Sequence, residues 1–496
     1  MCAFHQARVP IPEVNGARRE PGFEETLLPY SEQAAVLEAE RCLQCAMPYC
    51  AQSCPLTQDC RRVVDLMAHR RFAEAARQVL RHNPLSSVVC KTCYHYCEED
   101  CPKGEKGEPI AIRHLERTAL EFVEPDLTYV PRPPNGDRVA VVGAGPSGLM
   151  AAWDLALRGY SVDLYDGEAD PGGLLNSIPR FRLPQDELEK DLRRFRGLDI
   201  HFDGGKHAGS DITPEGLLDQ GYAAVFVAVG SSRVRVLSIP GVDLPGVYYA
   251  VPFLTAMNRA PGGSLAYSMA FSAAQKGPPR SDPFGRRGRR VVVIGGGDAA
   301  LDAARTARRL SFAGGVTVVY RRKERDMPSS PEVKKDAERE GIAFLFQRAP
   351  VEIVGNGRVE GLVVWPTNAT SPNGRGRLAP SPRSLVATTL PCDTIIIAIG
   401  AEPDASAGIP GPQTGVSRNR RTGAARYRFM TLTDGVFASG GSSVVHAMRA
   451  GAEAAESIDA YVAQKRGRGP TPRPDPFGDP FPPGVPEGYL EPTWHL

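Results

Sequence analysis

Residues 138–158 read RVAVVGAGPSGLMAAWDLALR, and this stretch decides the fold of the region around it. The valine-rich run 139–142 predicts a buried strand, and the run 149–158, rich in alanine and leucine, predicts a helix. The turn between them has the spacing GxGxxG. Its first glycine permits a tight turn, its second lets a pyrophosphate approach the backbone, and its third lets the helix pack against the strand. The N–H groups that start the helix are free to bind phosphate.

A second strand is predicted at 161–165, and it ends in Asp166, an acid that can accept hydrogen bonds from ribose hydroxyls. The alternative is a glycine-rich turn followed by an incidental acid. The flanking strand and helix favour a dinucleotide site, for which the sequence predicts Gly143, Gly145, Pro146, Ser147, Gly148 and Asp166.

The pattern restarts once, with a strand at 291–294, the turn 295–300 of spacing GxGxxA, and an alanine-rich helix to about Leu310. The next strand, 316–320, ends in two arginines instead of an acid. Arginine can pair bidentately with a 2′-phosphate that a carboxylate would repel, so this site should prefer NADPH to NADH. A merely solvated strand end is the alternative. The predicted residues are Gly295, Gly297, Asp298, Ala299, Arg321 and Arg322.

Two dinucleotide sites in one chain indicate a tightly bound flavin, FAD, beside an exchangeable nicotinamide. Hydride passes between the two rings when they stack, and the protein mainly supplies that geometry. Because this step requires no ionisable side chain, we predict no catalytic residue.

The cysteines predict a metal-binding region. Of eleven, nine fall between Cys42 and Cys101, in a long chain whose N-terminus lacks an apolar signal core. The first set is Cys42-x2-Cys45-x4-Cys50-x3-Cys54-Pro, close to a ferredoxin run, and the second is Cys93-x3-Cys97-x3-Cys101-Pro. Zinc is the alternative, but zinc sites usually pair two Cys-x2-Cys knuckles. We therefore expect iron–sulfur clusters.

These motifs together resemble the small (β) subunit of bacterial glutamate synthase. The same arrangement is similar to the N-terminal half of dihydropyrimidine dehydrogenase and to the large subunit of NADH-dependent ferredoxin:NADP oxidoreductase. Besides both dinucleotide turns, the likeness rests on the segments 38–45, 172–175, 181–184, 239–241, 320–322 and 398–400. It covers roughly residues 20–460.

The resemblance implies two [4Fe–4S] clusters in an N-terminal helical domain. By position, Cys42, Cys45, Cys50 and Glu116 resemble the ligands of one cluster, and Cys54, Cys93, Cys97 and Cys101 those of the other. Cys60 and Cys90 are additional thiols, interpreted as inert buried residues, with Cys90 as an alternative to Cys93 among the ligands. His95 and His114 are interpreted as packing or surface residues. The resemblance also implies cofactor contacts at Gly173, Leu174, Arg182, Gly400 and Gly440.

The chain departs from the resemblance near its C-terminus. The family's strand there ends in Gly-Asp, and Gly441 stands at the aspartate position of this chain. A loop of several residues is also missing, which motivates a second hypothesis, a flavin-deficient iron–sulfur relay or scaffold. A disulfide reductase is excluded, because it needs a redox cysteine pair near the nicotinamide domain and only Cys392 lies beyond residue 101.

The predicted fold class is α/β, with an N-terminal helical iron–sulfur domain followed by two nested Rossmann-like dinucleotide-binding domains. The expected limits are 1–134 for the cluster domain, 135–250 with 403–465 for the FAD domain, 251–402 for the NAD(P)H domain, and 466–496 for a proline-rich tail. That tail is expected to be disordered or laid against a partner, and the segment 260–289 to be a surface insertion.

The function expected is an electron-input subunit that works with a partner protein in a hetero-oligomer. The net charge of +2 gives no indication of nucleic-acid binding, and no apolar run is long enough for membrane insertion. We expect a cytoplasmic location, as the clustered thiols favour a reducing compartment.

Overall fold

The computed structural model describes residues 7–13, 24–123, 127–231, 233–259, 290–310, 314–372, 378–382, 386–402, 427–439, 441 and 443–478. The predicted insertion at 260–289 and the predicted cofactor contact Gly440 lie outside these residues.

The N-terminal part is a group of short helices. They are α1 (Glu32–Ala39), α2 (Tyr49–Ser53), α3 (Cys60–Ala68), α4 (Phe72–His82), α5 (Ser86–Thr92), α6 (Tyr96–Glu99) and α7 (Ile112–Leu120), with the 3₁₀ turn η3 (Pro102–Glu105) between the last two.

Side chains that cap the helix starts explain where two of these helices begin. The Ser31 hydroxyl accepts the N–H of Ala34 at the start of α1, and the Asp59 carboxylate accepts the N–H of Arg62 at the start of α3. The segment 62–80 lies in two helices, α3 and α4, because Arg70 adopts a φ of 59° that a right-handed helix cannot continue through.

The next part is a parallel sheet in the order β16-β4-β1-β2-β3. Its strands are β1 (Arg138–Val142), β2 (Ser161–Asp166), β3 (Ile200–Gly204), β4 (Ala224–Val227) and β16 (Val436–Ala438). The helical elements of this part are α8 (Pro146–Leu157), η4 (Gly173–Ser177), α9 (Gln185–Arg193), η5 (Arg194–Gly197), α10 (Pro214–Asp219) and α15 (Val444–Lys465). The apolar residues of β1 are buried, as expected for a central parallel strand.

A second parallel sheet has the order β6-β14-β7-β8-β9. Its strands are β6 (Val247–Tyr249), β7 (Val291–Gly295), β8 (Val316–Tyr320), β9 (Ala343–Phe346) and β14 (Thr394–Ala398). The helical elements of this part are α11 (Ala250–Arg259), α13 (Asp298–Arg309), η8 (Glu324–Asp326) and α14 (Pro331–Arg339). An antiparallel sheet is formed by β10 (Arg348–Val354), β11 (Gly361–Pro372), β12 (Leu378–Pro382) and β13 (Thr388–Pro391).

The two dinucleotide units are nested in the chain. The strand β16 and the helix α15 follow the second sheet in sequence, yet β16 belongs to the first sheet and α15 packs along α8. A two-stranded antiparallel ribbon of β5 (Arg233–Val234) and β15 (Ala401–Glu402) joins the units. The predicted fold class is therefore confirmed, although the second sheet begins at Val247, shortly before the predicted boundary at residue 251.

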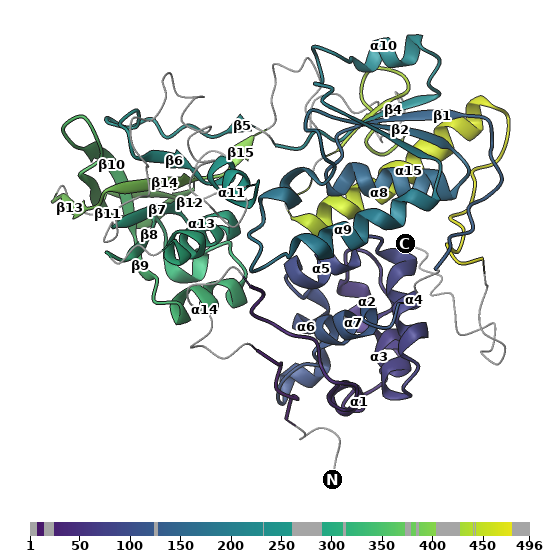
Figure 1. Cartoon of the computed structure of the whole chain (residues 1–496), viewed down its shortest axis with the longest axis horizontal. Coiled ribbons are helices and arrows are strands. Elements are labelled where there is room, and N and C mark those ends of the chain that lie inside the picture. Colours follow the sequence, from purple (N-terminus) through teal and green to yellow (C-terminus); the bar gives the residue numbers. More distant parts are fainter. Residues whose placement is uncertain are drawn as a thin grey trace.

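Figure 1 shows how the three parts are arranged. The helices α8, α9 and α15 lie between the first sheet and the N-terminal helices, while the second sheet stands to one side with α13 and α14 facing the junction. Within the described residues, no helix combines the length and apolar character that crossing a membrane would require.

The described part of the proline-rich tail packs on the chain itself, which corrects the expectation of a tail that is disordered or laid against a partner. Arg473 donates to the buried carboxylate of Asp154 at 2.8 Å and to the carbonyl of Arg81 at 3.1 Å. The N–H of Val130 donates to the carbonyl of Pro476 at 2.8 Å. These polar contacts join the first dinucleotide unit to α4, which explains why a segment with no regular element is held in place.

Candidate functional site

Two glycines of the first dinucleotide turn are required sterically, and the third borders open space. Gly143 has a φ of 111°, and a β-carbon there would stand 2.4 Å from the carbonyl oxygen of Ala228. A β-carbon at Gly148 would lie 1.7 Å from the carbonyl oxygen of Gly143, so the helix packs against the turn only because this residue is glycine. At Gly145 the space is open, with nothing within 4 Å. The turn thus keeps one face clear for a phosphate group.

The other predicted residues of this turn hold it in shape. Pro146 is the first residue of α8, where proline loses no hydrogen bond. Ser147 is buried, and its hydroxyl lies 3.0 Å from that of Ser439 at the end of β16. Asp166 accepts the N–H of Ala144 at 2.7 Å and that of Glu168 at 2.9 Å. Asp166, which is predicted to hydrogen-bond a ribose, therefore also holds the backbone of the turn in place.

The segment after β2 runs against the same turn. The N–H of Gly172 donates to the carbonyl of Ala144 at 2.8 Å, and a β-carbon on Gly173 would approach the α-carbon of Gly145 to 3.0 Å. Leu174 exposes half of its surface there. Gly173 and Leu174 therefore lie beside the open face, as a cofactor contact would require.

Arg182 has protein partners in the structure. Its guanidinium contacts the carboxylates of Asp302 at 2.6 Å and Asp298 at 3.5 Å, both on α13 of the second unit. The structure thus places Arg182, predicted to contact a cofactor, as a buried link between the two dinucleotide units.

The second dinucleotide turn resembles the first, with one sterically required glycine and one glycine beside open space. Gly295 has a φ of 147°, and a β-carbon there would stand 2.2 Å from the carbonyl oxygen of Ala398. Gly297 precedes α13 and has nothing within 4 Å. Asp298 opens α13 and accepts the N–H of Ser330 at 2.9 Å, and Ala299 is half-buried beside it.

The two arginines at the end of β8 differ in exposure. Arg321 is exposed and Arg322 is half-buried. The carbonyl of Arg321 accepts the hydroxyl of Thr367 at 2.7 Å, so the backbone is held while the side chain faces solvent. Gly400, which follows β14 with a φ of 97°, also has open space around it.

Five thiols line one cavity in the helical part. They are those of Cys42, Cys45, Cys50, Cys60 and Cys101. Among the described residues, no three His, Cys, Asp or Glu side chains converge on a single point as ligands of one metal ion would. Thiols spread around a cavity suit a cluster, in which each thiolate binds a different iron atom.

A second group of ligand-type side chains lies beside the first. Cys54, Cys93 and Cys97 interact with one another's charges and with that of Glu116, a buried acid in the middle of α7. Burial raises the pKa of the Cys93 thiol to about 11, and it raises that of Glu116 well above its usual range. Burial thus favours the neutral forms of these groups, and a positive centre between them would favour the ionised forms that bind a metal.

In the structure, Glu116 and Cys101 exchange places between the two ligand sets that the resemblance implies. Cys101 lies with Cys42, Cys45 and Cys50, and Glu116 lies with the second group. The reason is tertiary. The helix α6 packs on α2, where Ser53 donates a hydrogen bond to Asp100, and this contact brings the adjacent Cys101 toward the first group. The helix α7 packs on α5 and so presents Glu116 to the thiols that follow α5.

Basic side chains also line the cavity. Arg61 donates to the carbonyl of Cys45 at 3.2 Å, and the buried Lys103 lies on the opposite stretch of chain. A thiolate-bound cluster is anionic, so cations in its wall offset the cost of burying it. The residues present fit an iron–sulfur cluster.

The loop between Cys93 and Cys97 touches both dinucleotide units. The phenol of Tyr94 lies near the carboxylate of Asp298 at the start of α13, and that of Tyr96 lies near Ser443 at the start of α15. The ring of Tyr96 also packs edge-on against His446, with the centroids 5.3 Å apart. The only sequence signal for this contact is the Tyr-His-Tyr run between two cysteines, and the predicted site did not include these tyrosines.

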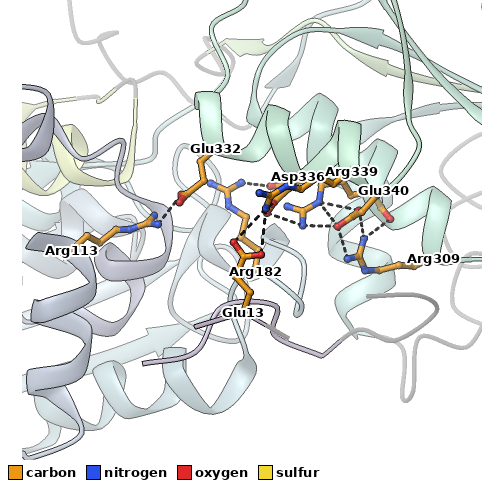
Figure 2. A network of polar contacts seen from close by, with 10 residues as sticks. Glu13, Arg113, Arg182, Arg309, Glu332, Asp336, Arg339 and Glu340 are labelled. Atoms are coloured by element: carbon orange, nitrogen blue, oxygen red, sulfur yellow. Dashed lines mark hydrogen bonds and ion pairs between the residues drawn. The ribbon is translucent and has the colours of Figure 1, made fainter. Parts of the chain in front are cut away.

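Figure 2 shows a polar network that joins the helical part to the second dinucleotide unit. Arg113 of α7 pairs with Glu332 of α14 at 2.7 Å, and nearby Glu340 accepts from Arg305 at 2.7 Å and from Arg309 at 2.6 Å. Nothing in the local sequence marks these residues, because each partner lies far away in the chain.

Two histidines of the helical part are buried among these charges. His95 lies 3.6 Å from Glu332, and burial lowers its pKa well below the usual value. Burial, with a contribution from Arg113, lowers the pKa of His114 to about 2. Both rings are therefore neutral at pH 7, and they pack within the domain junction.

The backbone excludes an acid at position 441. A β-carbon on Gly441 would stand 2.4 Å from the nitrogen and the α-carbon of Ala447. The helix α15 begins at Val444, only a few residues after β16, and so fills the space that a side chain would need.

Comparison with known proteins agrees with this architecture. Residues 18–126 match the family described as dihydropyrimidine dehydrogenase domain II, 4Fe-4S cluster, and residues 137–457 match the pyridine nucleotide-disulphide oxidoreductases. The chain is 34% identical to the glutamate synthase [NADPH] small chain of Halomonas elongata, over 91% of this chain and 96% of that one. It is 30% identical to the NADP(+)-dependent formate dehydrogenase subunit beta of Moorella thermoacetica, over 84% of this chain and 60% of that one.

A solved structure shares the fold of the dinucleotide units. A variant of FprA from Mycobacterium tuberculosis has a TM-score of 0.51 and 20% identity, over 68% of this chain and 86% of that one. The sequence matches cover nearly the whole chain, and both domain types that they name are present in the structure. The chain therefore belongs to the glutamate synthase small-chain family, FAD- and NAD(P)H-dependent oxidoreductases that carry an N-terminal 4Fe–4S domain.

Proposed function

We propose that this chain oxidises NADPH and passes the electrons, one at a time, through two [4Fe–4S] clusters to a partner subunit. The observation that carries the proposal is the position of the Cys93–Cys97 loop. The ring of Tyr96 packs against His446 of α15, and the phenol of Tyr94 lies near Asp298 at the start of α13, so one group of ligand-type residues lies next to both dinucleotide units. Electron transfer requires such closeness between the redox groups.

The two turns would divide the nucleotide binding. The turn with Gly145 would hold FAD, beside Gly173 and Leu174, and the turn with Gly297 would hold the nicotinamide nucleotide. A bound flavin supplies the step from two-electron to one-electron chemistry. Arg321, exposed at the end of β8, would pair with the 2′-phosphate and so select NADPH.

The eight predicted ligands would form two sets, which lie next to each other. We define the inner set as Cys54, Cys93, Cys97 and Glu116, and the outer set as Cys42, Cys45, Cys50 and Cys101. The inner set adjoins α15, since Arg449 of that helix donates to the carbonyl of Pro55 at 3.2 Å. We also propose the domain limits given by the sequence.

The partner would dock over the outer set. Met47 and Tyr49, which lie within two residues of Cys45 and Cys50 in the chain, expose 54% and 45% of their surface. Large apolar side chains exposed next to a redox centre are typical of a protein contact. The two relatives named above are described as a chain or subunit of larger enzymes, which supports an electron-accepting subunit as the partner. A reducing compartment such as the cytoplasm suits so many thiols.

The proposal is tested by preparing the full chain without oxygen. We expect about eight iron atoms per chain, as two [4Fe–4S] clusters require, and about one FAD. NADPH should bleach the flavin absorbance, and a second polypeptide should co-purify from the native source. A colourless protein with zinc on its thiols would refute the proposal.

A flavin-deficient relay is the second candidate, and Gly441 is the observation that favours it. The early start of α15 changes the wall of the flavin site where the family has an aspartate. Flavin content separates the candidates: protein with full iron and no FAD would support the relay, and FAD that NADPH reduces would exclude it.

A further inference from the structure

The helix α5 belongs to the helical part by sequence, yet it packs into the first dinucleotide unit. Leu85, just before the helix, and Val88 and Val89 within it are buried in the same apolar cluster as Leu188 of α9 and Trp153 of α8. Figure 1 shows α5 next to α9, where the two parts of the chain meet. The position of α5 is therefore set by the first dinucleotide unit.

The start of α5 is capped by a side chain of that unit. Asp191 of α9 is fully buried, and its two carboxylate oxygens accept the N–H of Ser87 at 3.2 Å and that of Val88 at 2.9 Å. N–H groups in the first turn of a helix have no partner within the helix. The residue before α5 is Leu85, whose apolar side chain cannot supply one. Asp191 thus caps a helix of a different part of the chain.

Arg194 extends this contact to the residues that precede the first turn. Its guanidinium forms an ion pair with Asp191, and it donates to the carbonyl of Pro84 at 3.0 Å and to the hydroxyl of Ser86 at 2.9 Å. The side chain of Arg194 is only 12% exposed, so water screens these contacts little. The carboxylate and the guanidinium together hold the start of α5 against α9.

The other end of α5 leads to a predicted cluster ligand. Cys93 of the inner set directly follows the helix, and its N–H donates to the carbonyl of Val89 at 2.9 Å. The Cys93 side chain also packs against the apolar cluster that buries α5. The helix has seven residues and is therefore about 10 Å long. A helix this short and this well packed moves as one piece, so fixing its start also fixes Cys93.

We propose that Asp191 is a positioning residue for electron transfer: by capping α5, its carboxylate holds Cys93, and with it the inner cluster, in place against the first dinucleotide unit. This inference rests on the proposed function, since it needs a flavin and an inner cluster. Asp191 acts through the helix and belongs to neither the predicted cofactor contacts nor the predicted ligands. Transfer between two redox groups depends on their separation, so a displaced cluster would receive electrons more slowly.

The test compares three variants of the complete, anaerobically prepared protein with the wild type. Asp191→Ala removes both acceptor oxygens, and Asp191→Asn keeps one of them. Ser31→Ala is the matched control, because it removes a helix cap inside the helical part, at the start of α1. For each protein we would measure amide hydrogen exchange, iron per chain, the midpoint potentials of the clusters, and the rates at which NADPH reduces the flavin and then the clusters.

We expect exchange in the segment 86–93 to accelerate by roughly 5- to 30-fold in Asp191→Ala, as the loss of a helix cap implies. The flavin should be reduced at the wild-type rate, and the clusters should follow several-fold more slowly at unchanged potentials and iron content. Slower transfer without a change in potential is the signature of a displaced cluster. Asp191→Asn should restore part of the rate. Ser31→Ala should accelerate exchange in α1 and leave both rates unchanged.

Three results would overturn the inference. Wild-type exchange in the segment 86–93 of Asp191→Ala would show that the carboxylate does not hold α5. Faster exchange with cluster reduction at the wild-type rate would show that Asp191 affects stability alone. Shifted cluster potentials would show that its charge, and not the position of α5, matters to the clusters. If Asp191→Ala loses iron or does not fold, Asp191→Asn decides between these outcomes by the same measurements.

The wild type keeps this test separate from that of the proposed function. Wild-type protein that lacks clusters or flavin refutes the proposed function. Wild-type protein that passes electrons from flavin to clusters, at a rate that does not respond to Asp191→Ala, refutes only the role of Asp191.

Discussion

Replacing Gly441 tests the most unusual feature of the flavin side of this chain. The family has an aspartate here, and two variants are informative: Gly441→Ala, which adds only a β-carbon, and Gly441→Asp, which restores the family residue. In the structure that β-carbon would stand 2.4 Å from the backbone of Ala447 and 2.7 Å from its side chain.

The loss in the free energy of unfolding can be worked out from these distances. Unbonded carbon atoms prefer a separation of about 3.5–4.0 Å, so the start of α15 must move by about 1 Å to admit the new atom. Overpacking of this kind typically costs about 1–3 kcal/mol. For a domain of roughly 150–250 residues, each kcal/mol lowers the melting temperature by about 2–4 °C, which gives a fall of about 2–12 °C for the alanine variant.

The assay is thermal unfolding of the full chain followed by the fluorescence of Trp153, which is fully buried in α8 next to α15. Gly469→Ala is the control, because that glycine has nothing within 4 Å of its β-position. Gly441→Asp should unfold at least as early as Gly441→Ala and should not gain flavin. A Gly441→Ala protein that melts with the wild type would refute the reasoning, as would an aspartate variant that gains FAD at no cost in stability.

Other changes test the remaining parts of the site. Arg321→Ala should raise KM for NADPH by roughly tenfold or more, because it removes a charge-assisted hydrogen bond of about 1.5–3 kcal/mol, and it should leave KM for NADH nearly unchanged. Equal effects on both KM values in steady-state kinetics would remove the basis for NADPH selection. Glu332→Gln should lower the free energy of unfolding by only about 1 kcal/mol, because Glu332 is 36% exposed and water screens its ion pair with Arg113. The same variant should nevertheless slow the reduction of the clusters by NADPH in stopped-flow experiments. Reduction at the wild-type rate would show that this contact does not couple the domains. Burial, together with Arg473 and Arg81, lowers the pKa of His82 to about 3, so the unfolded chain binds one more proton than the folded chain between about pH 6.5 and pH 3. The free energy of unfolding should then fall by up to about 1.4 kcal/mol per pH unit on acidification through this window, and His82→Gln should lessen that slope in urea titrations; an identical slope in the variant would contradict the assignment.

The local chemistry of the dinucleotide turns could be read from the sequence. At Gly143 and Gly295 the backbone takes positive φ values and passes close to a neighbouring carbonyl, and only glycine allows this. These constraints act over a few residues, so the strand, the turn and the helix each have a recognisable residue pattern at adjacent positions. The same holds for the two cysteine runs, whose spacing alone indicates clusters, because neighbouring ligands of one cluster lie a few residues apart.

What the sequence by itself determined is thus the type of each element and the chemistry of its side chains. It could not determine which distant residues meet. Cys101 joins the outer set and Glu116 the inner set because α6 packs on α2 and α7 packs on α5. Arg182 points at α13 and the tail lies across α4 for the same reason. These contacts come from the burial of helix faces that are far apart in the chain, a property of the whole fold that no local pattern carries.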